Sequence, residues 1–123
     1  MKIIAHRGLW KTPEKQNTLS AFYAAIKKGF GIETDVRDYK GELVISHDVP
    51  NEKKQILLFR DFITKISNNR QIHKVPLAIN IKSCDLGELL NQELHHLESL
   101  KNVFIFDMAV PDMMNYLKNK PPW

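Results

Sequence analysis

The side chains best suited to acid–base and metal chemistry occur as three short pairs within the first fifty residues. In chain order the pairs are His6 and Arg7, Glu33 and Asp35, and His47 and Asp48. Side chains two apart in a strand share a face, so two carboxylates at that spacing repel each other unless a positive charge lies between them. An imidazole takes up or gives back a proton near neutral pH. The pattern predicts a site in which two histidines move protons beside a charge-balanced acidic pair.

Two explanations of the acidic pair remain open from the residues alone. Ca²⁺ and Mg²⁺ prefer carboxylate, amide and water oxygens, so a divalent cation would relieve the repulsion between Glu33 and Asp35. Alternatively, the two carboxylates pair with Arg7 and with Lys82 in a buried ion network. A single histidine at a strand end is also commonly a structural, hydrogen-bonded residue. The adjacent His95 and His96 are interpreted as a solvent-facing pair.

Apolar residues alternate along the chain between the spacings of strands and of helices. The spacing predicts strands over 2–5, 31–36, 43–45, 76–82 and 103–106, and helices over 19–26, 59–66, 86–97 and from Pro111 onward. Asn17 and Thr18 are suited to cap the first helix, and Gly41 to supply a turn with positive φ. Alternating strands and helices imply parallel strands whose site lies at their carboxyl ends. The three pairs, Asn80, Lys82 and Asp107 are all predicted at strand ends.

Length and composition fit one ordinary domain over residues 1–123. With 43% hydrophobic and 26% charged residues it is unlike disordered chains or disulfide scaffolds, and its one cysteine, Cys84, suits a reducing, cytoplasmic location. No apolar run is long enough for a transmembrane segment, and the apolar start is too short for a signal peptide. The formal net charge of +4 is scattered, so we expect an anionic small molecule as partner and no nucleic acid.

Three segments in order resemble the amino-terminal half of the glycerophosphodiester phosphodiesterases, relatives of the phosphatidylinositol-specific phospholipases C. They read AHRG, then NTLSAFYAAIKKGFGIETDV, then GELVISHD, and they contain the HRG, E-x-D and HD elements of that family. The resemblance implies a TIM-type (β/α) barrel, of which this chain holds roughly the first half. That half comprises about four βα units and a small β-hairpin insertion.

The resemblance also implies an activity, the metal-dependent hydrolysis of a glycerophosphodiester or similar phosphodiester to an alcohol and a phosphomonoester. By position, His6 and His47 are the acid–base pair, and Arg7 and Lys82 bind phosphate. Glu33 and Asp35 bind Ca²⁺ or Mg²⁺. The family usually has Glu-x-Lys where this chain reads Asn80-Ile81-Lys82, so we expect Asn80 as the third metal ligand, through its amide oxygen and with weaker binding.

The chain is too short for a complete barrel, and this suggests an alternative function. A complete (β/α)₈ barrel takes about 250 residues, and this chain has 123. We therefore expect a truncated product or a part of a longer chain, with open sheet edges that favour self-association. The alternative function is accordingly a non-catalytic barrel fragment that binds phosphate or metal, or self-associates through those edges.

Overall fold

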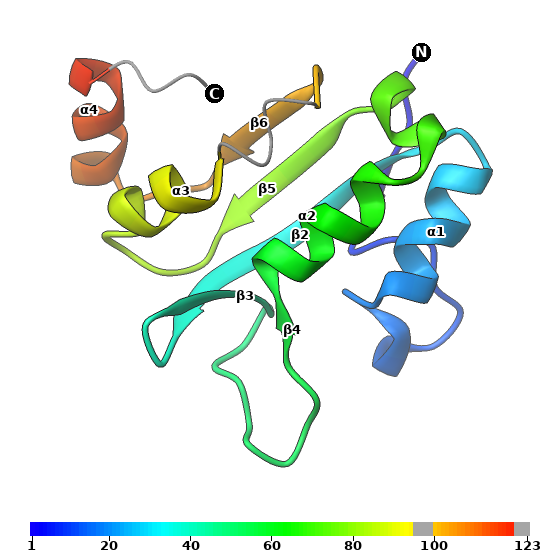
Figure 1. Ribbon diagram of the computed structural model, residues 1–123, viewed down its shortest axis with the longest axis horizontal. Helices are drawn as coiled ribbons and strands as arrows, with labels where there is room; N and C mark the ends of the chain where they lie inside the picture. The colour runs from blue at the N-terminus through cyan, green and yellow to red at the C-terminus, as the bar shows by residue number, and fades with distance from the viewer. Residues whose placement is uncertain (95–99, 120–123) are drawn as a thin grey trace.

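The computed structural model describes residues 1–94 and 100–119, which form a mixed α/β fold (Figure 1). Its one sheet has six strands: β1 (Ile4–His6), β2 (Gly31–Tyr39), β3 (Glu42–Ile45), β4 (Leu57–Leu58), β5 (Leu77–Ile81) and β6 (Val103–Phe106). The α-helices of the described residues are α1 (Leu19–Lys27), α2 (Phe59–Ser67), α3 (Gly87–Leu94) and α4 (Val110–Asn119). Two short 3₁₀ helices, η1 (Pro13–Lys15) and η2 (Arg70–Lys74), complete the elements. The alternation of strands and helices confirms the predicted α/β class.

Strand β2 is the centre of the sheet and pairs with three neighbours. Its first part runs parallel to β1 on one side and to β5 on the other, and β5 in turn runs parallel to β6. From Val36 to Tyr39 it pairs antiparallel with β3, and β4 follows β3. The register sets His6 opposite Glu33, and Asp35 opposite Asn80. Side chains from three parallel strands are thereby brought to one region of the sheet.

Local chemistry accounts for the ends of the first helix and for the hairpin. The Thr18 hydroxyl accepts a hydrogen bond from the Ala21 N–H, which confirms the predicted cap of α1. Gly29 follows the helix with φ of 75°, as expected at a helix carboxyl end. The hairpin turns at Lys40 and Gly41, whose φ values of 51° and 81° confirm the predicted positive φ at Gly41.

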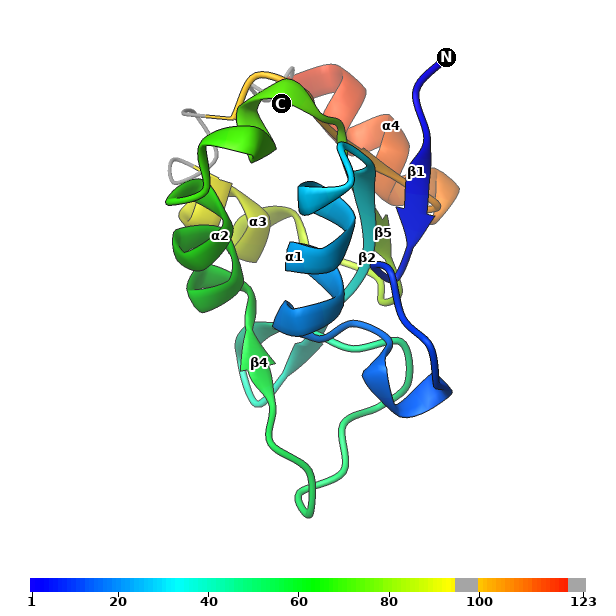
Figure 2. The ribbon, with the colours of Figure 1, turned by 90° about the vertical axis from the view of Figure 1, so that its right-hand side faces the viewer.

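The core lies between the sheet and the helices α1 and α2, which lie side by side on one face of the sheet (Figure 2). Phe22 of α1 and Phe62 of α2 meet edge to face with their ring centroids 4.9 Å apart. Leu86, just before α3, and Leu90, within it, are buried in the same cluster. Each fully buried side chain of this size stabilises the fold by about 1.5–3 kcal/mol through its removal from water.

Several predicted bounds differ from the structure. The second strand was expected to end at Val36 but continues to Tyr39, because its last residues pair with β3. Glu33 and Asp35 therefore lie inside β2, although near the end of its parallel part, and Asn80 lies inside β5. The short strand β4 and both 3₁₀ helices were not predicted. The prediction of a helix to Leu97, and of His95 and His96 facing solvent, falls partly or wholly outside the described residues.

Both outer strands of the parallel part have one unpaired edge within the described residues. In the part of the chain that the structure describes, β1 pairs only with β2, and β6 pairs only with β5. Ile4 and Phe104, which belong to these two strands, expose 40% and 45% of their surface. Such edges are the places where another strand can add. No helix of residues 1–94 and 100–119 has the length and apolar character needed to cross a membrane.

Candidate active site

The predicted site begins at a sharp turn directly after β1. Arg7 and Gly8 both have positive φ, at 57° and 84°, and the Gly8 N–H donates to the Ala5 carbonyl at 3.2 Å. A Cβ on Gly8 would lie 2.8 Å from the backbone of Ala21 in α1. Only glycine fits this position, because both the backbone angle and the close approach to the helix exclude a side chain. The turn brings the Arg7 side chain over β2.

Asp35 is the buried centre of the site, with no exposed surface. Its Oδ2 lies 2.9 Å from the Arg7 Nε and accepts a hydrogen bond of 2.9 Å from the Asn17 Nδ2. Its Oδ1 lies 3.7 Å from the Lys82 Nζ. A buried carboxylate is costly unless charges and donors compensate it, and here two cations and one amide do so.

Glu33, the other member of the acidic pair, has a different set of partners. Its Oε2 accepts a hydrogen bond of 3.0 Å from the Arg7 backbone N–H and lies 3.8 Å from the His6 Nε2. Its Oε1 accepts from the Asn80 Nδ2 at 3.2 Å. Glu33 is buried, whereas the His6 side chain is 65% exposed. The imidazole therefore sits at the solvent side of the acidic pair, where a substrate can reach it.

Lys82 joins the site to the next strand. Its Nζ lies 3.4 Å from Oδ2 of Asp107, which directly follows β6 and has φ of 62°. Arg7 and Lys82 both form ion pairs with Asp35. These are the ion pairs that the sequence analysis gave as the alternative to a divalent cation. Within the described residues the Glu33 carboxylate takes no ion pair from the side chain of Arg7 or of Lys82, and the titratable side chain beside it is His6. The ion pairs with Arg7 and Lys82 thus balance the charge of Asp35 but not that of Glu33.

The residues also offer oxygen atoms to a divalent cation. Asp35 Oδ1 and Asn80 Oδ1 are buried and have no hydrogen-bond partner in the described part of the chain. They come from residues that face each other across β2 and β5, and both are hard oxygen donors of the kind that Ca²⁺ and Mg²⁺ bind. No group of three or more His, Cys, Asp or Glu side chains that could hold a metal occurs among residues 1–94 and 100–119. The unpartnered oxygens of Asp35 and Asn80 are thus of the type that a divalent cation binds, whereas both Glu33 oxygens already accept hydrogen bonds.

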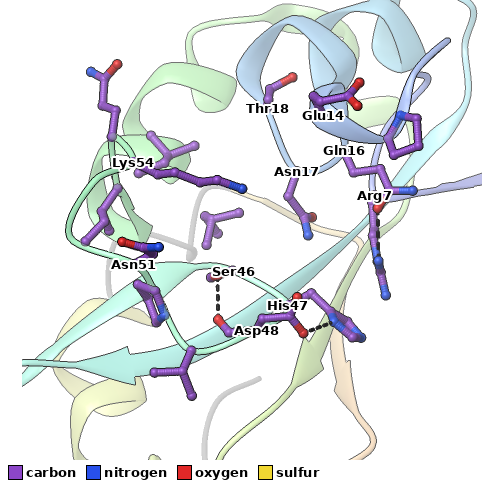
Figure 3. Close-up of a pocket in the computed structure, with 17 residues that line it drawn as sticks. Arg7, Glu14, Gln16, Asn17, Thr18, Ser46, His47, Asp48, Asn51 and Lys54 are labelled. Atoms are coloured by element: carbon purple, nitrogen blue, oxygen red, sulfur yellow. Dashed lines mark hydrogen bonds and ion pairs between the residues drawn. The ribbon is translucent and has the colours of Figure 1, made fainter.

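His47 lines a cavity of about 480 Å³ together with Arg7 (Figure 3). One wall of this cavity is η1 and the residues after it up to Thr18, and the other is the loop from Ser46 to Ile56. His6 is not among the lining residues. The structure thus places six of the predicted residues in one contact network, namely His6, Arg7, Glu33, Asp35, Asn80 and Lys82. His47 lies outside that network and joins it through the cavity it shares with Arg7.

His47 is held by its neighbour in sequence. The Nδ1 of His47 lies 2.8 Å from Oδ1 of Asp48 (Figure 3). This hydrogen bond, followed by the charge of His47 and then by the charges of Arg37 and Arg7, holds the pKa of the Asp48 carboxyl below its usual value. With Nδ1 engaged, Nε2 is the ring nitrogen left for another partner. A carboxylate that holds one ring nitrogen is the usual way to orient an acid–base imidazole.

Three residues at the site had no predicted role there. Asn17 has φ of 54°, donates to Asp35, and accepts at 3.1 Å from the Thr34 hydroxyl, while its N–H donates to the Arg7 carbonyl. Gln16 accepts from the Arg7 guanidinium at 3.0 Å, and Lys54 lines the cavity. An Asn-Thr pair before a helix reads as a cap, and only the fold shows that the asparagine turns back to Asp35.

Comparison with known proteins identifies the fold. No protein-family model matches the sequence, and no curated protein matches it either. A crystal structure from Galdieria sulphuraria, described as a "putative glycerophosphodiester phosphodiesterase", superposes with a TM-score of 0.75 at 20% sequence identity. The superposition covers 98% of this chain and 61% of that one. The chain therefore has the fold of the corresponding part of that protein, and it spans about three fifths of its length.

Proposed function

We propose that this chain is a phosphodiesterase domain of the glycerophosphodiester type. It hydrolyses a glycerophosphodiester, or a similar small phosphodiester, to an alcohol and a phosphomonoester with the help of a divalent cation. The observation that carries the proposal is the arrangement around Arg7. This one residue contacts both carboxylates of the buried pair and also lines the cavity that contains His47. The fold shared with the Galdieria protein supports it.

The two imidazoles divide the proton transfers in this proposal. A hydroxyl of the substrate next to the phosphorus attacks it, and one imidazole takes the proton of that hydroxyl. The other imidazole gives a proton to the leaving alkoxide, so that no free alkoxide forms. The attack of the neighbouring hydroxyl leaves a cyclic phosphate. Water then hydrolyses this cyclic phosphate, with the same proton transfers in reverse. Asp48 orients His47 for its part, and the exposed His6 beside Glu33 performs the other.

Charge on the nonbridging oxygens grows as the phosphorus is attacked, and the site offers positive charge to offset it. Glu33, Asp35 and Asn80 are the proposed ligands of a Ca²⁺ or Mg²⁺ ion, which when bound polarises phosphoryl oxygens as a Lewis acid. Arg7 and Lys82 are the proposed phosphate-binding residues, and both already pair with Asp35. Their place beside the acidic pair keeps positive charge close to the phosphate.

The same proposal includes the barrel. The parallel strands β1, β2, β5 and β6 would be the first four strands of a TIM-type barrel, with β3 and β4 as the hairpin insertion. The parallel register, the position of α1 and α2 on one face of the sheet and the polar residues near the carboxyl ends of the strands support this assignment.

The activity is tested by incubating the chain with glycerophosphodiesters in the presence of Ca²⁺ or Mg²⁺. Release of glycerol phosphate that stops on chelation and returns with the cation is the expected result. Release that continues in chelator would contradict the cation's role, and no release from any glycerophosphodiester would contradict the proposed activity.

A non-catalytic fragment is the second candidate, and the unpaired edges of β1 and β6 favour it. This form would bind phosphate or a cation at the same residues, or associate with itself through those edges. Calorimetry that shows Ca²⁺ binding without turnover, with elution at a size above 14.3 kDa, would favour the fragment over the enzyme.

A further inference from the structure

The cations at the proposed site differ in how far their charge is already balanced. The Arg7 guanidinium is held by Asp35 at 2.9 Å and by Gln16 at 3.0 Å. Lys82 lies within 4 Å of both Asp35 and Asp107, and it does not line the cavity. Neither of the two residues predicted to bind phosphate is thus a free positive charge facing the cavity.

Lys54 is different. It lines the cavity from the loop between β3 and β4 and has no carboxylate within 4 Å in the part of the chain that the structure describes. Glu14 lines the same cavity from the other wall, and Lys54 is the last and smallest of the causes that lower the pKa of the Glu14 carboxyl. A backbone N–H and the Thr12 side chain are the larger causes of that lowered pKa, so Glu14 is not a dedicated partner of Lys54.

The turn in the loop sets where the Lys54 side chain leaves the backbone. The Lys54 N–H donates to the Asn51 carbonyl, and the Lys53 N–H donates to the Asn51 Oδ1, both at 3.0 Å, so the chain makes a tight turn at Asn51. In Figure 3 the Lys54 side chain extends from this turn into the cavity, with its amino group directed toward Asn17. Asn17 itself bonds to Asp35, and its N–H to the Arg7 carbonyl. The ammonium group thus approaches the Arg7 region from the opposite wall.

We infer that Lys54 is the residue that binds the phosphate anion in this cavity, across from Arg7 and His47. The inference rests on the proposed function for the identity of the natural ligand, a phosphodiester. It adds a third cation to the proposed phosphate-binding residues, since Asp35 already balances part of the charge of Arg7 and Lys82, and Lys54 supplies the uncompensated charge. A lysine is a point charge on a flexible stem and can follow a phosphate whose position shifts between substrate and product.

Binding of inorganic phosphate to the whole chain tests this inference without turnover. Lys54→Met should raise the Kd for phosphate about tenfold to a hundredfold, the effect of losing one hydrogen bond from a charged donor. Lys53→Met is the matched control, because it removes the same charge from the adjacent residue, which is exposed like Lys54 but does not line the cavity. It should change the Kd less than twofold, and Lys54→Arg should keep most of the affinity.

Equal weakening by the Lys53 and Lys54 substitutions would overturn the inference, because a general surface field would then explain the binding. Absence of phosphate binding to the unchanged chain would overturn it as well. Turnover separates this inference from the proposed function. Diester hydrolysis with a KM unaffected by Lys54→Met leaves the enzyme standing and removes the role of Lys54. Phosphate binding that depends on Lys54, without hydrolysis of any diester, would keep the role of Lys54 and remove the proposed enzyme activity.

Discussion

The guanidinium Nε of Arg7 lies 2.9 Å from Oδ2 of Asp35, a carboxylate with no exposed surface. Arg7 has a left-handed backbone, with φ of 57°, which costs a residue other than glycine about 1–2 kcal/mol. The buried ion pair therefore compensates two penalties, the strain at Arg7 and the desolvation of Asp35. This pair ties the turn after β1 to the central strand, so the fold and the site share one interaction.

Asn17 should stabilise this arrangement both through its side chain and through its backbone. Asn17→Gly keeps the positive φ but removes the bonds to Asp35 and Thr34, and we expect it to lower the free energy of unfolding by about 1–3 kcal/mol. Asn17→Ala should cost about 1–2 kcal/mol more, because alanine is strained at that φ. Urea denaturation of the two variants measures the difference. Equal losses would show that the left-handed backbone contributes no strain.

Gly8 and Gly29 form a matched pair for the turn after β1. Both have positive φ, but a Cβ on Gly8 would meet Ala21 at 2.8 Å, whereas no atom of residues 1–94 and 100–119 lies within 4 Å of a Cβ on Gly29. Gly29→Ala should therefore cost only the backbone term of about 1–2 kcal/mol, and Gly8→Ala about 2–5 kcal/mol in total, since overpacking adds about 1–3 kcal/mol. Denaturant midpoints of both variants test this, and equal costs would refute the steric role of the HRG glycine.

The sequence predicted the elements well where apolar spacing was regular. Thr18, Gly41 and the helical faces that contain Phe22 and Phe62 were recognisable because local chemistry fixes them. The extension of β2 to Tyr39 was not, since it depends on pairing with β3, which no local pattern reveals. The same contrast between local patterns and long-range contacts applies to the site. The types and spacing of Glu33 and Asp35 indicated an acidic pair, but which cation meets which carboxylate depends on contacts between residues far apart in the chain.

The dyad of His47 and Asp48 predicts a defined response to pH. Because His47 lowers the pKa of Asp48, the stabilisation from this pair is present above the ordinary carboxyl pKa and is lost as pH falls through the lowered one. An NMR titration of Asp48 should show a midpoint below that of an ordinary aspartate, and His47→Ala should move it upward. His73→Ala, in η2, is the control and should leave it unchanged. A midpoint that His47→Ala does not move would contradict the dyad.

The charge of residue 80 should set the strength of cation binding. Asn80→Asp replaces the amide that donates to Glu33 with a third carboxylate, so without a cation it should lower the melting temperature. With a cation the extra charge should tighten Ca²⁺ binding about tenfold, because ligand charge tunes affinity. Melting curves in Ca²⁺ and in chelator measure both effects. Asn80→Ala is the control and should respond least to Ca²⁺, and an equal response of all three proteins would contradict a cation site here.

The central claim is that His6 and His47 act together on one phosphodiester. Phosphorus NMR of a glycerophosphodiester with the chain and Ca²⁺ follows substrate and product directly. We predict that His6→Ala and His47→Ala each slow the loss of the diester signal by at least about a hundredfold, while His73→Ala leaves it unchanged. Turnover that persists at the original rate in either His6→Ala or His47→Ala would contradict the account.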